Sequence, residues 1–299
     1  MASTTRRDPV LITGCSSGIG RAAAISLNNA GFPVYATARN AEALADLAPR
    51  GIRTLALDVT DETSMTRAVA AVEDAEGWTG VLINNAGYGL YGPVEQQPMT
   101  EVRRQFETNV FGPVRLIQLV LPGMRGRGRG RILNLSSMGG RATLPGGAFY
   151  HASKYAIEAI SDALRMEVAE FGIDVVLIEP GPVNTPWNDV AAASLSTAVP
   201  DAGGAGPGEA GDGRDRDDPY AAFKAAVAAS FVTAHNGPLA RLGSSADDVA
   251  AVITRAVTAR RPRTRYLINP VARSVVTLNR VLPGRAYDAV LRRQYKLPG

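Results

Sequence analysis

Short apolar segments alternate with longer helical segments along most of this chain, and this alternation limits the fold more than any other feature of the sequence. The helical segments are long enough to cross a sheet and return the chain parallel to the previous strand. We expect helices at about residues 19–29, 101–121 and 149–171, the second ending before Pro122. We expect buried strands at residues 9–13, 33–37, 52–57, 81–84, 131–135, 173–178 and 265–268. The sequence therefore predicts an α/β fold, a doubly wound parallel sheet of about seven strands with helices on both faces.

Composition and length exclude several classes of protein. The 299 residues are 45 % hydrophobic and 20 % charged, as is typical of a globular protein. The single cysteine, Cys15, and two distant histidines, His151 and His235, cannot supply a disulfide framework or a Cys/His metal site, so we expect no bound metal. Residues 1–8 are polar and no apolar run of about 18 residues occurs, so we expect a cytoplasmic protein without a transmembrane segment.

A glycine-rich loop, Thr13-Gly-Cys-Ser-Ser-Gly-Ile-Gly20, follows the first predicted strand and opens the first predicted helix. Glycine lets the backbone turn tightly and approach a pyrophosphate, while the N–H groups and positive dipole end of the helix face the phosphates. This context favours dinucleotide binding on a Rossmann fold over a plain strand–helix turn. We expect Cys15 to be a small loop residue and not a redox thiol. The expected phosphate-binding residues are Gly14, Ser16, Ser17, Gly18, Ile19 and Gly20.

The end of the second strand distinguishes between the two nicotinamide cofactors. An acid at this position usually binds the ribose 2′-hydroxyl of NAD, but here the chain reads Ala36-Thr-Ala-Arg39. The guanidinium of Arg39 can instead pair with a 2′-phosphate, so we expect NADP(H) as the cofactor. Ser17, the other place for a basic residue, is neutral. Asp58 and Val59 end the third strand, where we expect the adenine.

A tyrosine and a lysine lie four residues apart in Tyr150-His-Ala-Ser-Lys154, which places both on one face of a helix. A tyrosine hydroxyl has an ordinary pKa of about 10, and we expect the nearby ammonium to lower it. Tyr150 would then exchange a proton with a carbonyl or alcohol oxygen. Ser137, at the end of the fifth strand, could hold the same oxygen. Ordinary surface or core polarity is the alternative for each of these residues taken alone.

The order of these motifs resembles that of the short-chain dehydrogenase/reductase family, in its branch with a single nucleotide-binding domain. The matching residues span most of residues 9–185: the glycine loop, Asn84-Asn-Ala-Gly87, Asn109, Ser137, Tyr150-x-x-x-Lys154 and Pro180-Gly-Pro-Val-Asn-Thr185. The resemblance implies that Tyr150 is the proton donor, Ser137 a ligand of the substrate oxygen and Lys154 both a modifier of the tyrosine pKa and a ribose ligand. It implies that Asn109, at a helix irregularity, holds the water of a proton relay. The remaining cofactor contacts that it implies are Asn85, Ala86, Gly87, Pro180, Gly181, Val183 and Thr185.

Three segments resemble the hydroxysteroid and retinol dehydrogenase group within that family. They are residues 12–20, residues 34–39 and Gly87-Tyr-Gly-Leu-Tyr-Gly-Pro93, and residues 262–267 fit the group's last strand. The likeness fades after Thr185, where substrate choice is normally made, so the group's substrate class is suggested and no more.

Residues 187–241 form the expected substrate lid. Residues 199–219 are rich in Gly, Asp and Pro and predict a mobile loop. In residues 220–231, Tyr220, Phe223, Val227 and Phe231 recur at helical spacing and would close a dry, hydrophobic pocket over the nicotinamide. We expect Trp187 to form a pocket wall or to pack in the core, and His151 to pack, whereas His235 could face the site.

The C-terminal part of the chain is basic. Residues 260–299 hold ten basic residues and one acid, Asp288. Two amphipathic pieces in residues 271–291, broken at Pro283-Gly284, could roof the pocket, join a partner subunit, rest on a membrane surface or cover the sheet edge. Residues 124–131 repeat Arg-Gly without aromatic residues, so we expect a flexible surface turn there and no nucleic-acid partner.

These observations together predict an enzyme. We expect an NADP(H)-dependent oxidoreductase that interconverts a ketone and a secondary alcohol on a fairly hydrophobic small molecule. The alternative is a non-catalytic NADP-binding sensor or regulatory protein on the same fold, which would have no need of a proton donor. We expect residues 1–299 to form one domain, with a basic C-terminal extension at about 270–299, and the protein to be a homodimer or homotetramer.

Overall fold

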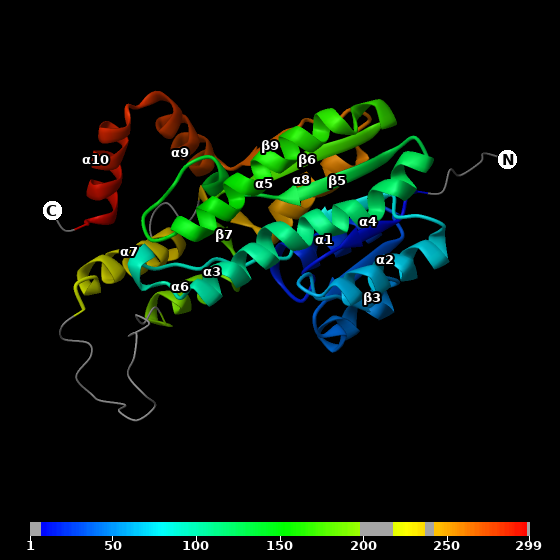
Figure 1. The fold of residues 1–299 in the computed structure, drawn as a ribbon, viewed down its shortest axis with the longest axis horizontal. Coiled ribbons are helices and arrows are strands. Elements are labelled where there is room, and N and C mark those ends of the chain that lie inside the picture. Colours follow the sequence, from blue (N-terminus) through cyan, green and yellow to red (C-terminus); the bar gives the residue numbers. More distant parts are fainter. Residues whose placement is uncertain (1–6, 198–217, 237–241, 298–299) are drawn as a thin grey trace.

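A seven-stranded parallel sheet forms the centre of the molecule (Figure 1). The computed structural model describes residues 7–197, 218–236 and 242–297. The strands lie in the order β3-β2-β1-β4-β5-β6-β9, and every neighbouring pair is parallel, which confirms the expected fold class. The strands are β1 (Val10–Ile12), β2 (Val34–Ala38), β3 (Arg53–Ala56), β4 (Val81–Asn84), β5 (Gly130–Leu135), β6 (Ile173–Pro180) and β9 (Arg265–Ile268). A separate parallel pair joins β7 (Val183–Asn184) to β8 (Ser244–Ser245).

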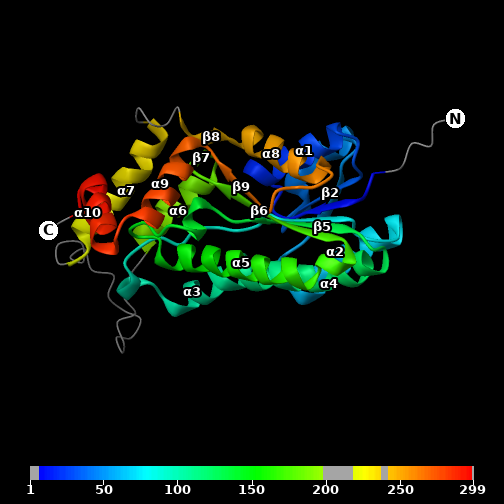
Figure 2. The ribbon, with the colours of Figure 1, turned by 90° about the horizontal axis from the view of Figure 1, so that it is seen from above.

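Helices cover both faces of the sheet, as Figure 2 shows. One face carries α1 (Gly18–Asn29) and α8 (Ala246–Thr258), and the other carries α2 (Glu62–Glu76), α3 (Met99–Phe106), α4 (Gly112–Gly126) and α5 (Ala148–Glu167). Alternate residues of β1 enter different cores: Val10 and Ile12 pack on the α1 side and Leu11 on the α2 side. Because both faces are covered, the strands are apolar on both sides, and this is why they appear in the sequence as continuous apolar runs.

The prediction of one continuous helix over residues 101–121 is wrong at the centre of that range and at its end. A π-helical turn, Glu107–Phe111, separates α3 from α4, and α4 continues through Pro122 to Gly126. Pro122 is exposed, so water can satisfy the carbonyl that its missing N–H leaves free, and the last turn buries Met124 completely. The flexible turn expected at 124–131 is therefore shorter than expected, because α4 ends at Gly126 and β5 begins at Gly130.

Four further helices gather at one end of the sheet, α6 (Trp187–Thr197), α7 (Ala221–Asn236), α9 (Pro270–Val281) and α10 (Gly284–Tyr295) (Figure 1). The break between α9 and α10 falls at the expected Pro283-Gly284. Residues 199–217 of the expected mobile loop lie outside the described residues. In the part of the chain that the structure describes, no helix has the length and apolar character needed to cross a membrane.

The glycine loop is tied to the end of β4 by a compact set of contacts. Thr13 Oγ1 accepts hydrogen bonds from the backbone N–H groups of Asn85 and Ala86, each at 3.0 Å. Asn85 Nδ2 donates to the carbonyl oxygens of Thr13 at 2.8 Å and Gly14 at 3.0 Å. A Cβ on Gly20 would lie 2.4 Å from Asn85 Nδ2 and 2.5 Å from the Gly14 oxygen. The loop can therefore reach this position only because residue 20 has no side chain.

Replacing Gly20 with alanine should destabilise the fold, although alanine is the better helix former. The added methyl group must displace Asn85 or the Gly14 carbonyl, and overpacking of this kind costs about 1–3 kcal/mol. Urea unfolding measures the change in the free energy of unfolding. The matched control is Gly126→Ala, because a Cβ there would meet none of the described atoms within 4 Å. Equal stability of the two variants would contradict the steric argument.

Candidate active site

A large cleft lies at the carboxyl ends of the strands and has a volume of about 1340 Å³. Every residue expected to bind the cofactor lines this cleft except Gly20, which packs behind the loop. Of the expected catalytic set, Ser137, Tyr150 and Lys154 line the cleft, and Asn109 lies behind its wall. The structure thus brings together side chains from segments that are up to 170 residues apart in the sequence.

The glycine-loop end of the cleft fits a pyrophosphate. Gly14 has a φ of 72° and Gly18 a φ of 57°, conformations that side chains rarely adopt. Ser17 precedes α1 in an extended conformation, and its side chain makes no capping hydrogen bond to a described residue. The first N–H groups of α1 can therefore serve a phosphate. Across the cleft, Thr185 Cβ lies 3.4 Å from the position of a Cβ on Gly18, so Gly18 leaves room there.

Cys15 plays no part in the chemistry of this loop. Its side chain is fully buried, and its thiol donates to the Ile12 carbonyl at 3.4 Å. Burial raises the pKa of the Cys15 thiol to about 12. A thiol that stays protonated is a poor nucleophile, which agrees with the expectation of a small, inert loop residue.

Arg39 and Asp58 line the cleft beside the glycine loop, since the N–H of Cys15 in that loop donates to the carbonyl of Thr37 near the end of β2. Arg39 is exposed at the end of β2 and lines the cleft, and no ion pair to it occurs among the described residues. Asp58 Oδ1 accepts hydrogen bonds from the backbone N–H of Thr60 at 2.9 Å and from its hydroxyl at 2.8 Å. The Asp58 carboxylate is thus hydrogen-bonded within its own turn, while the Arg39 guanidinium supplies a positive charge to the cleft. This arrangement fits a ribose 2′-phosphate better than a 2′-hydroxyl.

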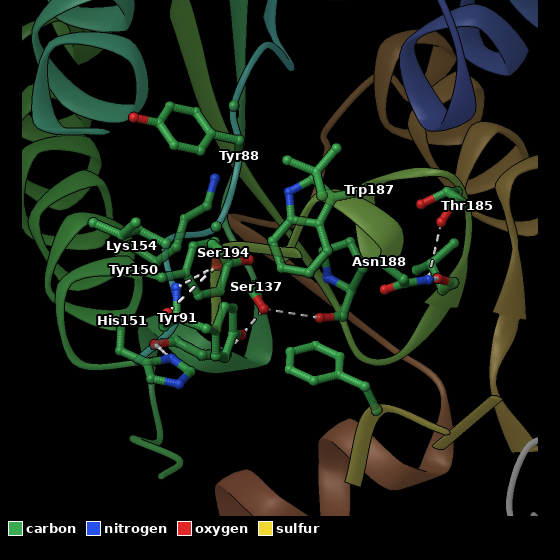
Figure 3. A pocket seen from close by; sticks show the side chains of 18 of the residues that line it. Tyr88, Tyr91, Ser137, Tyr150, His151, Lys154, Thr185, Trp187, Asn188 and Ser194 are labelled. Atoms are coloured by element: carbon green, nitrogen blue, oxygen red, sulfur yellow. Dashed lines mark hydrogen bonds between the residues drawn. The ribbon is translucent and has the colours of Figure 1, made fainter. Parts of the chain in front are cut away.

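Tyr150 and Ser137 meet at the centre of the cleft, and their hydroxyl groups hydrogen-bond each other (Figure 3). Ser137 is oriented by the short helical turn that it precedes, because its oxygen accepts the Gly139 N–H at 3.0 Å. Tyr150 is only 8 % exposed, and its burial raises the pKa of the phenol to about 12 despite the hydrogen bond from Ser137. The expected lowering of this pKa by Lys154 is therefore wrong for the protein alone, since burial is the largest cause of the shift and only Ser137 opposes it.

Lys154 lies beside Tyr150 but is held by the backbone of β5. Its Nζ is 5.9 Å from the centre of the Tyr150 ring and donates to the Leu135 carbonyl at 2.7 Å. Burial also lowers the pKa of the Lys154 ammonium, to about 8, and Glu158 opposes this effect. A Cβ on Gly87 would lie 3.8 Å from Nζ, so the ammonium faces the wall of the cleft where a ribose is expected.

Asn109 is located in the π-helical turn, which is the helix irregularity implied by the family resemblance. Its side chain is 2 % exposed and spans the wall of the cleft. Nδ2 donates to the Tyr88 carbonyl at 2.9 Å and to Ser153 Oγ at 3.1 Å, while Oδ1 accepts the Tyr88 N–H at 3.2 Å. The side chain thus fixes the loop after β4 against α5.

An aromatic cluster forms the wall opposite the glycine loop. Tyr91 is its centre: its ring lies 5.8 Å from that of Tyr150, 6.3 Å from Trp187 and 4.9 Å from Phe231. Trp187 is also 5.2 Å from Tyr150, so of its two expected roles the structure favours the pocket wall (Figure 3). A Cβ on Gly89 would lie 2.6 Å from the indole, so glycine is needed there for Trp187 to fit.

The helix α7 supplies the rest of this wall. Phe223, Val227 and Phe231 pack against the aromatic cluster, as their spacing predicts. Tyr220 differs from them, because it precedes α7 and its hydroxyl bonds to Glu95 on the outside. The end of α10 closes the same region, since Tyr295 lines the cleft and hydrogen-bonds Ser230.

Sequence reasoning missed Tyr91 and Tyr295 as parts of this site. Neither belongs to a periodic apolar pattern that faces the pocket, and their positions depend on how distant segments pack. The only signal was that Tyr91 follows β4 in the glycine-rich segment 87–93, close to the carboxyl end of a central strand.

His151 packs beneath the cluster, as expected. Its Nδ1 is 3.0 Å from the Gly139 carbonyl and donates to it, which fixes the neutral tautomer, and burial lowers the pKa of the imidazole to about 4. A histidine held neutral in this way takes no part in proton exchange near pH 7. The side chain of His235 lies outside the described residues. No group of three or more potential metal-ligating His, Cys, Asp or Glu occurs within the described ranges.

Comparison with known proteins identifies the family. The family model for short chain dehydrogenases matches residues 8–195. The chain is 30 % identical over 296 residues to the NADPH-dependent 3-dehydrocapnine reductase of Ornithobacterium rhinotracheale, covering 96 % of each chain. It is 32 % identical over 293 residues to retinol dehydrogenase 5 of Mus musculus, covering 94 % of this chain and 87 % of that one.

A solved structure of a short-chain dehydrogenase from Streptomyces avermitilis is 31 % identical to this chain, with a TM-score of 0.74 over 99 % of this chain and 98 % of that one. A dinucleotide-binding α/β fold, with a tyrosine and a lysine on one helix lining the cleft at the carboxyl ends of its strands, is typical of one class of oxidoreductase, the short-chain dehydrogenases. This protein belongs to the short-chain dehydrogenase/reductase family.

Proposed function

We propose that this protein is an NADP(H)-dependent oxidoreductase that interconverts a ketone and a secondary alcohol on a fairly hydrophobic substrate. The observation that carries the proposal is the pair of hydrogen-bonded hydroxyls, Tyr150 and Ser137, at the junction of the glycine-loop cleft and the aromatic pocket. A sensor that only bound a dinucleotide would have no use for a buried proton donor at this junction.

The chemistry divides between the cofactor and the chain. The nicotinamide, when bound, exchanges a hydride with the substrate carbon. Ser137 and Tyr150 hydrogen-bond the substrate oxygen, and Tyr150 donates its proton to that oxygen as negative charge develops there. With its pKa raised to about 12, the phenol is fully protonated near pH 7 and is still a stronger acid than an alcohol. The site is thus arranged for carbonyl reduction, in which the tyrosine must begin with its proton.

Replacing Tyr150 with phenylalanine should lower kcat by about 10²-fold or more, the range expected when a general acid is removed. The ring volume and the packing against Tyr91 and Trp187 stay the same. The measurement is NADPH oxidation with a ketone substrate, and NADPH binding, followed by its fluorescence, should be largely unchanged. Near-normal turnover in this variant would remove Tyr150 from the proposed mechanism.

Arg39 supports the choice of NADP(H). It is the cationic side chain that lines the adenosine end of the cleft, and the Ornithobacterium relative is named as NADPH-dependent. A guanidinium can form a two-pronged pair with a phosphate, whereas it gives a ribose 2′-hydroxyl no acceptor.

Replacing Arg39 with aspartate should therefore shift preference from NADP(H) toward NAD(H). Charge-assisted hydrogen bonds contribute about 1.5–3 kcal/mol, so the ratio of kcat/KM for NADPH over NADH should fall by at least about tenfold. The control is Arg50→Asp, an exposed arginine at the end of the following short helix that does not line the cleft. Wild-type protein that already prefers NADH would contradict the role of Arg39.

We further propose that residues 187–241 act as a lid over the substrate. Its support is the apolar contact of α6 and α7 with the catalytic tyrosine, in which Ala191, Leu195 and Val227 are at most 5 % exposed. Such a pocket excludes water and favours a bulky apolar ketone over a sugar or a charged acid. The retinol dehydrogenase relative supports the same class of substrate.

A screen of ketones should therefore show higher kcat/KM for bulky apolar substrates than for small polar ones. Phe231→Ala should reduce kcat/KM for the best apolar ketone by about tenfold, because that ring contacts Tyr91 across the pocket. Val232→Ala is the matched control, since Val232 is the next residue and is 60 % exposed. Best activity on small polar carbonyls, or equal effects of the two changes, would contradict the proposed pocket.

A further inference from the structure

A third functional side chain continues the catalytic face of α5. Tyr150, Lys154 and Glu158 follow one another at intervals of four residues, which places them in one stripe along the helix. All three are buried, at 8 %, 7 % and 6 % exposure. The first two belong to the proposed mechanism, whereas Glu158 has no role in it.

Glu158 is held in a buried network of charges behind the cleft. Arg265, from β9, places Nε 3.1 Å from Glu158 Oε2 and 3.0 Å from Glu179 Oε1. Arg265 also pairs with Asp162 on α5, and Arg141, just after the turn that Ser137 caps, lies 3.3 Å from Glu179 Oε2. The groups that face Glu158 are thus Lys154 and Asp162 on its own helix, Glu179 on β6, Arg265 on β9 and the Ser136 hydroxyl after β5.

Glu158 and Glu179 share Arg265 as a partner, because its Nε lies within 3.1 Å of one oxygen of each carboxyl group. The two buried carboxyl groups therefore lie close together and repel each other when both are ionised. Burial, followed by repulsion from Glu179, raises the pKa of Glu158 to about 7, and burial also raises the pKa of Glu179. Glu158 therefore becomes a full anion as the pH rises through about 7.

Lys154 depends on that anion. Its hydrogen bond to the Leu135 carbonyl supplies no negative charge, and burial disfavours the ammonium. Glu158 is the group that opposes this effect of burial. The pKa of Lys154, about 8, is thus the balance of the two, and the charge of Lys154 in the interval between pH 7 and 8 rests on Glu158.

We propose that Glu158 is a positioning residue that keeps Lys154 in its charged form at the pH of the cell, so that the ammonium can hold the ribose and face Tyr150. The inference rests on the proposed function of Lys154. Its test reads the charge of Lys154 directly, so it can fail or hold independently of turnover.

The composition of the chain makes this test direct. It contains only three lysines, Lys154, Lys224 and Lys296. Protein labelled with ¹³C at lysine Cε therefore gives three signals, and Lys224→Arg and Lys296→Arg assign the signals of the other two lysines by elimination. The measurement is the pH titration of the Lys154 signal in the full-length protein without cofactor, with circular dichroism and thermal unfolding as checks of the fold.

In wild-type protein, the Lys154 signal should titrate near pH 8 and show a smaller inflection near pH 7, where Glu158 loses its proton. In Glu158→Gln, the main titration should fall by about one pH unit or more, as expected when a nearby opposite charge is removed. The smaller inflection should disappear. An unchanged Lys154 titration in folded Glu158→Gln would overturn the proposal.

Two controls separate charge from structure. Glu179→Gln removes the other acid of the same pair and keeps Arg265 paired with Glu158, so the main Lys154 titration should stay within about 0.3 pH units. Its smaller inflection should move to lower pH because Glu158 is no longer repelled. Asp162→Asn also loses a partner of Arg265 and should leave both inflections in place. Equal shifts of the main Lys154 titration in Glu158→Gln, Glu179→Gln and Asp162→Asn would overturn the proposal.

The proposal can also be tested if Glu158→Gln does not fold. A Lys154 titration without the smaller inflection near pH 7 in wild-type protein would overturn it, and so would a smaller inflection that does not move in Glu179→Gln.

Activity then connects the charge to the reaction. The alkaline limb of kcat/KM for NADPH-dependent reduction should move to lower pH in Glu158→Gln by as much as the Lys154 signal moves, and not in Glu179→Gln. A shifted signal in a protein that reduces no ketone would leave the role of Glu158 intact and contradict the proposed function. Ketone reduction by a Glu158→Gln protein whose Lys154 signal does not shift would leave the proposed function intact and contradict the role of Glu158.

Discussion

The parallel pairing of β1 with β2 on one side and β4 on the other is the constraint on which this site depends. The chain leaves β1 toward one edge of the sheet and later returns to continue toward the other, so the connections after β1 and β4 diverge and a crevice opens between them. The hydrogen bonds of Thr13 and Asn85 bridge the floor of that crevice. They fix the distance between the loop that fits a pyrophosphate and the loop that carries the cleft wall, and the absence of a side chain at Gly20 permits that distance.

Much of this arrangement follows from local sequence. A buried parallel strand must be apolar on both faces, so the seven strands were recognisable as short apolar runs. The glycine loop, residues 84–87, Ser137 and residues 180–185 follow the ends of such runs, whereas Asn109, Tyr150 and Lys154 lie on helical segments. What the sequence could not show is how segments meet. The continuation of α4 past Pro122 depends on which side of the helix is exposed, and no local pattern of residues predicted the π-helical turn at 107–111. Tyr91 and Tyr295 enter the pocket from segments whose packing no local pattern encodes.

The pKa of Tyr150 shows the same limit more sharply. The spacing of Tyr150 and Lys154 correctly places both on one helical face, and an opposite charge at that spacing ordinarily lowers the pKa of a phenol. The aromatic cluster and α7 bury the hydroxyl, however, and the cost of burying a phenolate raises the pKa instead. The depth of burial is a property of the whole fold. It raises the pKa of Tyr150, whereas the spacing of Tyr150 and Lys154 suggests that this pKa is lowered.

Burial affects the two neighbours in the same way, since it favours the neutral form of each: it raises the pKa of Tyr150 and lowers that of Lys154. For the tyrosine this suits the proposed reduction, in which the phenol must hold its proton until charge develops on the substrate. For the lysine it is harmful, because an ammonium that loses its proton can neither orient a ribose nor stabilise negative charge nearby. A pocket as dry as the proposed substrate pocket therefore needs a source of negative charge behind the lysine and away from the substrate. Glu158 lies there, one turn farther along α5, and Arg265 anchors it to the last strand of the sheet. The hydrophobic character of the pocket and the ionic network behind it thus answer one physical problem, the need to keep a single charge stable in a site that excludes water.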